Sequence, residues 1–326
     1  MIIKIEDVLI ADDIEQECID ALLAGGINVV VKTNQSHDQL LELIPQFDAV
    51  IVRSATKITR QLIIAGAKGK LKIIGRAGTG VDTIDVQAAT EVAVIVMNTP
   101  TGNSQSAAEL TCALILALAR NIPQADASMK SGKWARKDYM GEEVGGKVLG
   151  IIGLGHIGKL VSKRMKAFNM KIIAYDPFVV KDIATSLHIE LVTLDEIYAQ
   201  SDYITVHVPL TDNTRNLINK DAFKKCKKAV KLVNVARGGI VNETDLAEAI
   251  VNGIVKGAAL DVFEQEPPKF RDLIDSEKVI AIPHLGASTK EAQIRVAKEI
   301  AENIITFNTT SEYVGAVNLS DIAKAG

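Results

Sequence analysis

A glycine-rich segment carries the clearest chemistry in the sequence. Gly153, Gly155 and Gly158 follow an apolar run and open a helical pattern, and Asp176 comes at the end of the next apolar run. Gly153 permits a tight turn, Gly155 lets the backbone approach a pyrophosphate, and Gly158 allows the helix to pack closely on the strand. The N–H groups at the helix start favour phosphate, and the Asp176 carboxylate can bind ribose hydroxyls while repelling a 2′-phosphate. The segment therefore predicts an NAD site, with a ligand-free glycine turn as the alternative.

Three further residues could perform hydride-transfer chemistry beside such a cofactor. Oxidation of a hydroxyl group requires a base that titrates near neutral pH and a cation for the neighbouring carboxylate. The imidazole of His284 suits the base, and Glu266 could fix its tautomer and stabilise its protonated form. Arg237 follows an apolar run and precedes two glycines, so its guanidinium could bind a carboxylate through two hydrogen bonds. Taken alone, His284 is more typical of a structural histidine, and a surface salt bridge is the alternative for Arg237.

The composition indicates a globular α/β protein of about two domains. The chain has 326 residues, of which 48% are hydrophobic and only 4% aromatic. Its cores must therefore consist mainly of Ile, Val, Leu and Ala, which is typical of buried parallel sheets covered by helices.

Charge and cysteine content exclude several classes of function. The net charge is −3, which gives no electrostatic reason to expect a nucleic-acid partner. The densest basic run, Lys224 to Lys231, is interpreted as a solvated helix end and loop. Cys18, Cys112 and Cys226 are far apart and match no metal spacing, so we expect reduced thiols and no metal. The N-terminus reads as a strand and no apolar run is long enough for a membrane span, which favours a cytoplasmic protein with no membrane partner.

Short apolar runs and helical patterns alternate in two series, which predicts two parallel α/β units. The first series has expected strands at 8–11, 27–31, 49–52, 71–75 and 94–97. The second has expected strands at 148–152, 171–175, 204–208, 231–235, 255–260 and 279–282. Long helices are expected at 103–120 and 289–307, the first capped by Ser104 or Ser106, with Glu109 at the capping-box spacing from Ser106.

Five segments in this order and spacing resemble the D-isomer-specific 2-hydroxyacid dehydrogenase family. They are Gly75–Asp82, Gly153–Gly158, Val235–Glu243, Ala259–Pro268 and Ile282–Thr289, and the resemblance runs from about Val8 to Ala316. The segments Val52–Lys57, Thr99–Ser104 and Gly132–Trp134 further resemble an animal-type branch of this family. That branch oxidises 3-phospho-D-glycerate to 3-phosphohydroxypyruvate, the first step of L-serine synthesis, with NAD.

The resemblance implies an architecture that the residues alone do not give. It implies a Rossmann cofactor domain (100–286) inserted into a flavodoxin-like substrate domain (1–99 and 287–326), each a doubly wound parallel sheet. It also implies an active site in the cleft between the domains and a homodimer or higher homo-oligomer formed through the cofactor domain. Longer relatives carry C-terminal regulatory domains, so a chain that stops at Gly326 resembles a short or truncated form without feedback control by serine.

The resemblance also implies roles for individual residues. His284, Glu266 and Arg237 would be the catalytic set, and Asp261 would hold the nicotinamide carboxamide. The cofactor-binding residues would be Thr79, Gly153, Gly155, His156, Ile157, Gly158, Asp176, Val208, Val235, Ala236, Asp261, Gly286 and Ala287. The residues that bind the phosphorylated 2-hydroxy acid would be Arg53, Arg76, Gly78, Asn103 and Arg136, the last reaching the substrate site of a partner subunit.

Two other functions fit the same motifs. One is a reductase of glyoxylate or hydroxypyruvate on the same scaffold, and the other is an NAD-sensing binding protein without turnover. Arg53 and Arg76 favour the phosphorylated substrate, because an enzyme for unphosphorylated acids gains nothing from two phosphate-binding cations.

Overall fold

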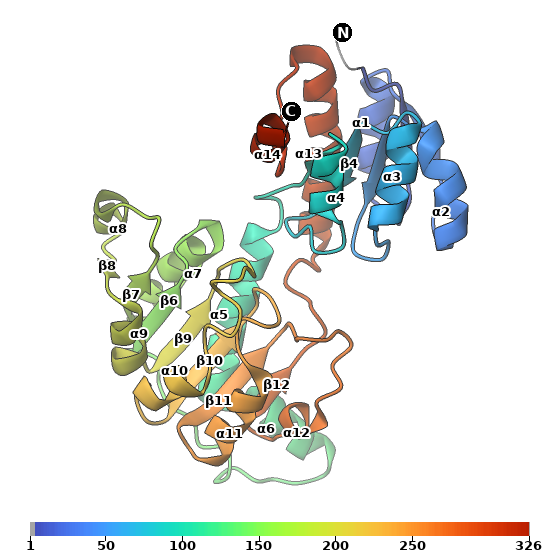
Figure 1. The fold of residues 1–326 in the computed structure, drawn as a ribbon. Helices are drawn as coiled ribbons and strands as arrows, with labels where there is room; N and C mark the ends of the chain where they lie inside the picture. The colour runs from blue at the N-terminus through green and yellow to red at the C-terminus, as the bar shows by residue number, and fades with distance from the viewer. Residues whose placement is uncertain (1–3, 326) are drawn as a thin grey trace. The chain divides into compact units, whose positions relative to one another are not determined.

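The computed structural model describes residues 4–325 and contains two compact units (Figure 1). The first combines the chain up to Asn103 with the part from Thr289 onward, and the second comprises Ser104–Ser288. The expected domain boundaries, 99/100 and 286/287, lie a few residues before these divisions.

The first unit is built on a five-stranded parallel sheet with strand order β2-β1-β3-β4-β5. Its strands are β1 (Asp7–Ile10), β2 (Asn28–Val31), β3 (Ala49–Val52), β4 (Ile73–Arg76) and β5 (Ile95–Met97). Its helices are α1 (Gln16–Ala24), α2 (His37–Leu43), α3 (Arg60–Lys68), α4 (Val86–Glu91), α13 (Lys290–Thr310) and α14 (Leu319–Ala325), with a short 3-10 helix η1 (Ile44–Gln46). Alternate strand residues pack into two apolar cores, one of them with α1 and α13, because a parallel sheet buries both faces.

The second unit is built on a seven-stranded parallel sheet with strand order β12-β11-β10-β9-β6-β7-β8. Its strands are β6 (Val148–Ile152), β7 (Lys171–Tyr175), β8 (Glu190–Leu191), β9 (Tyr203–Val206), β10 (Val230–Asn234), β11 (Val255–Leu260) and β12 (Val279–Ala281). The chain winds from β6 through β7 to β8 on one side and continues from β9 on the other. The strand order therefore reverses beside β6, and such a switch point is where open α/β sheets bind ligands.

Helices cover both faces of this second sheet (Figure 1). They are α5 (Ser104–Arg120), α6 (Ile122–Lys130), α7 (His156–Ala167), α8 (Lys181–Ser186), α9 (Leu194–Gln200), α10 (Lys220–Lys225), α11 (Glu243–Val251) and α12 (Arg271–Ile274). Residues of α5 and α7 contribute to one core, and residues of α9, α10 and α11 to the other. The predicted fold class, two parallel α/β sheets, is confirmed. Within the described part of the chain, no helix is long and apolar enough to cross a membrane.

The predicted cap of α5 is wrong. The helix already begins at Ser104, and Ser106 is buried in its first turn, where its backbone is helical and cannot occupy the capping position. Glu109 instead accepts a hydrogen bond from the side chain of Gln105, one turn earlier on the same helix. The serines of this segment lie in the helix and not before it.

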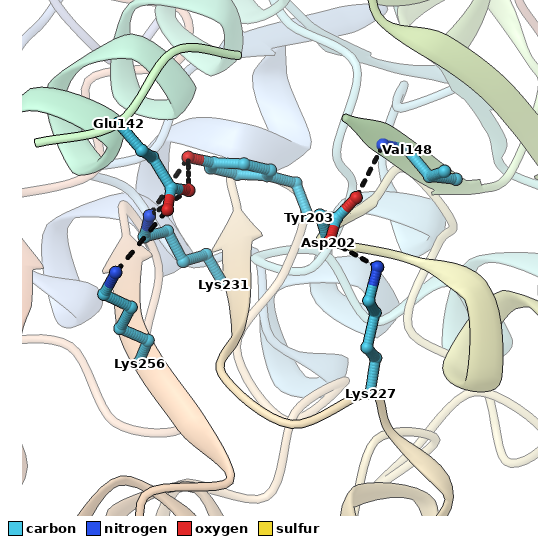
Figure 2. Close-up of polar contacts among 7 residues, drawn as sticks. All are labelled: Glu142, Val148, Asp202, Tyr203, Lys227, Lys231 and Lys256. Carbon is cyan, nitrogen blue, oxygen red and sulfur yellow. Dashed lines mark hydrogen bonds and ion pairs between the residues drawn. The ribbon is translucent and has the colours of Figure 1, made fainter. Parts of the chain in front are cut away.

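The interpretation of the basic run is wrong for its last member. Lys224, Lys225, Lys227 and Lys228 are exposed, but Lys231 lies in β10 with only 5% of its surface exposed. Figure 2 shows its partners: Lys231 Nζ lies 2.5 Å from Glu142 Oε1 and 3.1 Å from the Tyr203 hydroxyl. A partner that lies 89 residues away in the chain leaves no local signal in the sequence.

Glu142 is the centre of this ion-pair cluster. Burial opposes its ionisation, but hydrogen bonds from Lys231 and Tyr203 and the charges of Lys231 and Lys256 outweigh burial and lower its pKa to about 2. Its hydrogen bond from the Tyr203 hydroxyl is 2.7 Å long (Figure 2). The cluster ties the segment before β6 to the amino ends of β9, β10 and β11.

Replacing Glu142 by Gln should destabilise the second unit in a pH-dependent way. At pH 7 we expect a loss of about 3 kcal/mol in the free energy of unfolding, because Lys231 would remain buried without its counter-ion. The folded pKa of Glu142 lies below its ordinary value of 4.5, so its contribution is complete above that value and is lost as pH falls toward 2. Urea unfolding followed by fluorescence of Trp134, the single tryptophan, measures the effect.

The matched control is Glu143→Gln, at the exposed neighbouring carboxylate. It should leave the free energy of unfolding within about 0.5 kcal/mol of that of the parent protein. Equal losses for both variants at pH 7, or a loss for Glu142→Gln that is undiminished at pH 3, would contradict the assignment.

Candidate active site and dinucleotide site

The glycine turn lies at the carboxyl end of β6, where the strand order reverses. The strand ends at Ile152, α7 begins at His156, and the N–H of Gly153 donates to the carbonyl of Tyr175 at the end of β7. The positive end of the helix dipole and the N–H groups of its first turn therefore face the edge at which the strands end.

Two of the three glycines are required by the backbone, and the third faces open space. Gly153 has φ +96°, and a Cβ there would lie 2.6 Å from the carbonyl oxygen of His207. A Cβ at Gly158 would lie 2.2 Å from the carbonyl oxygen of Gly153. A Cβ at Gly155 would have no described atom within 4 Å. The turn thus holds itself tightly together and leaves room beside Gly155, as a bound pyrophosphate requires.

Asp176 is held beside this turn by backbone N–H groups. Its Oδ2 accepts from Leu154 at 2.8 Å, and its Oδ1 accepts from Phe178 at 2.9 Å. A carboxylate has about four acceptor positions, so both oxygens retain capacity for ribose hydroxyls. The fixed negative charge next to the turn disfavours a 2′-phosphate.

His284 and Glu266 form a hydrogen-bonded pair. The distance from His284 Nδ1 to Glu266 Oε2 is 2.7 Å, which is the contact that the sequence predicted. The other oxygen of Glu266 accepts the N–H of Phe263 at 3.2 Å. Because a carboxylate can only accept, Nδ1 carries the proton, and Nε2 of the neutral ring is an acceptor. Such a ring can take a proton from a hydroxyl group.

The turn that carries Arg237 packs against the segment that carries Glu266. A Cβ at Gly238 would lie 1.8 Å from the carbonyl oxygen of Phe263, so only glycine permits this approach. The half-buried guanidinium of Arg237 donates to the carbonyl of Ala236 at 2.7 Å. The turn of Arg237 and the segment of Glu266, the partner of His284, are therefore in direct contact.

Asp261 and Val235 meet at Gly286, two residues after His284. Asp261 is fully buried, and its carboxylate accepts N–H groups from Leu285 at 2.5 Å and from Gly286 at 2.8 Å. A Cβ at Gly286 would lie 3.1 Å from Asp261 Oδ2 and 3.2 Å from Val235 Cγ1. Burial raises the pKa of Asp261, and the two N–H groups oppose that rise.

A sequence profile establishes which protein family the chain belongs to. Residues 112–286 match the NAD-binding domain of D-isomer specific 2-hydroxyacid dehydrogenases. The chain belongs to this family. The matched region contains the glycine turn, Asp176, Arg237, Glu266 and His284, and its NAD-binding character confirms the cofactor predicted from the glycine turn.

Individual dehydrogenases resemble the chain over nearly its whole length. A D-3-phosphoglycerate dehydrogenase of Sus scrofa is 50% identical over 322 residues, which are 99% of this chain and 60% of that protein. One of Bacillus subtilis is 46% identical over 319 residues, covering 97% and 60%. The chain thus spans about 60% of the length of these curated relatives. The crystal structure of a glyoxylate reductase from Paecilomyes thermophila superposes with a TM-score of 0.88 at 27% identity, covering 96% and 98%.

His207, whose carbonyl lies beside Gly153, is not suited to be a base. His207 follows β9 and lies 3.1 Å from the Thr205 hydroxyl. Burial lowers its pKa to about 3, so its ring stays neutral at physiological pH. Val208, the next residue, packs toward Gly153, whose Cβ would lie 2.9 Å from Val208 Cγ1.

The remaining cofactor candidates of the matched domain occupy three places. His156 and Ile157 form the first turn of α7, His156 exposed and Ile157 packed against a core. The N–H of Ala236 donates to Asn234 Oδ1 at 2.9 Å, and Ala287 follows Gly286 in the segment held by Asp261. The exposed Arg136 lies apart from these residues in sequence, in the segment between α6 and β6.

The first unit holds the other expected substrate residues at the carboxyl edge of its own sheet. Arg76 ends β4 opposite Val52 of β3, so Arg53 and Arg76 leave neighbouring strands. The Arg53 guanidinium donates to the carbonyl of Asp13 at 3.2 Å. Gly78 has φ +149°, and a Cβ there would lie 2.7 Å from the Arg76 guanidinium.

Thr79 and Asn103 are joined in the same unit. The Thr79 hydroxyl donates to Asn103 Oδ1 at 2.8 Å. Thr79 is a predicted cofactor residue and Asn103 a predicted substrate residue, so one hydrogen bond connects the two predicted sets.

Sequence reasoning did not single out Asn234. It ends β10 with 2% of its surface exposed, and its side chain bonds the backbone of Ala236 and Arg237. The available signal was an Asn at the end of an apolar strand, immediately before a predicted functional turn, where Asn commonly bonds the backbone two residues on.

Alanine at two glycines should separate cofactor binding from folding. Gly155→Ala should keep the melting temperature within about 2 °C, since its methyl enters open space, but weaken NADH binding at least about 10-fold by blocking the pyrophosphate. Gly158→Ala should lower both the melting temperature and the affinity for NADH, because its methyl collides with the carbonyl of Gly153. Thermal unfolding and NADH fluorescence titration measure the two effects.

Gly145→Ala, at an exposed glycine of the same unit with ordinary contacts, should change neither the melting temperature nor NADH affinity. Unaltered NADH affinity in Gly155→Ala would refute the phosphate assignment.

Proposed function

We propose that the chain oxidises 3-phospho-D-glycerate to 3-phosphohydroxypyruvate with NAD. The observation that carries this proposal is the 2.7 Å hydrogen bond between His284 and Glu266, with the segment that carries Glu266 in contact with the Arg237 turn. The similarity to proteins named D-3-phosphoglycerate dehydrogenase, over nearly all of this chain, supports the choice of substrate.

The three polar groups have complementary tasks in the proposed reaction. His284 Nε2 accepts the proton of the substrate hydroxyl as the C–O single bond becomes a carbonyl. Glu266 accepts the Nδ1 proton throughout and stabilises the imidazolium that forms. Arg237 binds the substrate carboxylate through its planar guanidinium and thereby orients the reacting carbon. NAD, when bound, supplies the acceptor for the hydride that leaves this carbon.

The cofactor would be held by the predicted set from the glycine turn to Ala287. Gly155 leaves space for the pyrophosphate, Asp176 provides acceptors for the ribose, and the first turn of α7 provides N–H donors. Val208, Val235 and Ala236 provide apolar surface at the ends of β9 and β10. Each of these features suits NAD, and the carboxylate of Asp176 argues against NADP.

Arg53 and Arg76 would bind the substrate phosphate, and Gly78 and Asn103 of the same unit would contribute further substrate contacts. Two guanidinium groups on neighbouring strands provide the donors that a phosphate dianion requires. Arg136 would reach the substrate of a partner subunit in a homodimer. The exposure of Trp134 (74%) and Met140 (82%) in the same segment supports a partner surface there. The three free cysteines favour the cytoplasm as the compartment.

A reductase of glyoxylate or hydroxypyruvate is the second candidate. The TM-score of 0.88 to a glyoxylate reductase favours it, since the fold accommodates that substrate class. Rates with 3-phosphoglycerate and with glycerate distinguish the two, and so does the arginine pair.

Replacing His284 by Asn should abolish turnover without removing the cofactor. We expect kcat for 3-phosphoglycerate to fall about 1,000-fold or more, because the proton acceptor is lost, while NADH affinity changes less than about 3-fold. His188→Asn, at an exposed histidine of the same unit, is the control and should retain full activity. Steady-state NADH formation and NADH titration provide both readouts. NADH binding by the parent protein with no turnover of any D-2-hydroxy acid would support an NAD-sensing protein instead.

Removing either of the two arginines proposed to bind the substrate phosphate should raise the KM for the phosphorylated substrate only. In Arg53→Ala and Arg76→Ala we expect the KM for 3-phosphoglycerate to rise about 10- to 100-fold, through loss of charge-assisted hydrogen bonds. The KM for glycerate should stay within about 2-fold, because glycerate has no phosphate. Arg60→Ala removes an exposed arginine that pairs with Glu91 in the same unit, and should change neither constant. An unaltered KM for 3-phosphoglycerate in both arginine variants would exclude the phosphate assignment.

A further inference from the structure

Asn234 fixes the turn that carries Arg237. Its Oδ1 accepts the N–H of Ala236 at 2.9 Å, and its Nδ2 donates to the carbonyl of Arg237 at 2.9 Å. The side chain therefore bonds the backbone on both sides of the peptide that presents the guanidinium. A buried carboxamide with a donor and an acceptor both in use has little freedom to rotate.

Asp261 fixes the segment that carries His284. Its carbonyl accepts the N–H of His284 at 2.8 Å, and its carboxylate accepts the next two N–H groups, those of Leu285 and Gly286. Three consecutive backbone donors thus converge on one buried residue. His284 has φ +54°, in the left-handed region that side chains other than glycine seldom adopt, so this backbone needs external support.

The two residues are bonded to each other. The N–H of Asp261 donates to the carbonyl of Asn234 at 2.9 Å, between the ends of β10 and β11. One chain of hydrogen bonds therefore runs from the backbone of Arg237 through Asn234 and Asp261 to the backbone of His284. We refer to these contacts as the Asn234–Asp261 network.

We propose that Asn234 and Asp261 are positioning residues that set the distance between the carboxylate-binding cation and the base. The inference rests on the proposed function for the roles of Arg237 and His284, but the contacts themselves do not. Asn234 acts through Arg237 and therefore on substrate binding. Asp261 acts through His284 and therefore on the proton-transfer step.

The state of the Asp261 carboxylate supports its assignment to the protein backbone. Both oxygens already accept N–H groups, and the residue is completely buried. Each oxygen keeps one further acceptor position, so the carboxylate can hold this backbone and still accept a hydrogen bond from the nicotinamide carboxamide. Hydrogen exchange and kcat therefore test the positioning role, and cofactor affinity reports separately on the nicotinamide.

Hydrogen exchange of the unliganded parent protein gives the first test. The amides of Leu285 and Gly286 lie in a segment without regular secondary structure, and Leu285 is 42% exposed. We nevertheless expect protection of at least about 100-fold, because both donate to a buried carboxylate. Exchange at the rate of a free loop would overturn the proposal, whatever substrate the protein uses.

Two isosteric variants give the second test. Asp261→Asn replaces one acceptor by a donor that faces an N–H group, so we expect the protection to be lost and kcat to fall about 100-fold. Its Kd for NADH reports separately on the predicted contact with the nicotinamide carboxamide. Asn234→Asp keeps the acceptor but loses the donor to the Arg237 carbonyl, so we expect KM to rise about 10-fold while kcat changes less than about 3-fold.

Thr111→Val is the matched control. This threonine is also fully buried in the same unit, but its hydroxyl bonds only the backbone of its own helix, at Ala107. It should leave kcat, KM and the exchange of Leu285 and Gly286 unchanged. Equal kinetic losses in Thr111→Val would show a general effect of instability and overturn the proposal.

The remaining outcomes also discriminate. A Kd for NADH that rises more than about 10-fold in Asp261→Asn, with protection and kcat retained, would assign Asp261 to the nicotinamide alone. A parent protein that binds NADH but does not oxidise 3-phosphoglycerate would defeat the proposed function, and the exchange measurement would then decide the positioning roles by itself.

Discussion

The parallel direction of the seven strands in the second unit is the constraint on which the site depends. The carboxyl ends of parallel strands all lie at one edge of the sheet, so the residues that follow the strands lie at that edge too. Gly153 follows β6, Asp176 follows β7, Arg237 follows β10, Asp261 follows β11 and His284 follows β12. Residues separated by more than 130 positions in the sequence thus lie at the same edge of one sheet.

Buried charges lie at both edges of this sheet, and they have different kinds of partner. At the amino edge, Lys231 and Glu142 neutralise each other, and the pair ties an exposed segment to the sheet (Figure 2). At the carboxyl edge, Asp261 has backbone N–H groups as its partners and no cation among the described hydrogen bonds. A negative charge that is stabilised by dipoles fixes the backbone of this edge without a buried cation as its partner among the described hydrogen bonds.

The sequence predicted what depends on local pattern and what the family motifs encode. The alternation of apolar runs predicted most strands to within two residues, and the motifs predicted the contact between His284 and Glu266. The failures have separate causes. Lys231 was misread because its counter-ion lies far away in the sequence, and Ser106 because α5 already begins at Ser104. Asn234 was missed although an Asn at a strand end commonly bonds the backbone two residues on, because that pattern does not show that the bonded turn carries Arg237.

The Asn234–Asp261 network contributes little net stability, which is why its effect should be sought in kinetics. The two hydrogen bonds to the Asp261 carboxylate contribute about 1.5–3 kcal/mol each. Burying that carboxylate costs several kcal/mol, and the left-handed backbone at His284 costs about 1–3 kcal/mol more. These contributions nearly cancel. These contacts leave the stability of the fold nearly unchanged, but they hold the strained backbone of His284 in one conformation and thereby fix its geometry. In a dehydrogenase that geometry is the direction in which the imidazole accepts its proton.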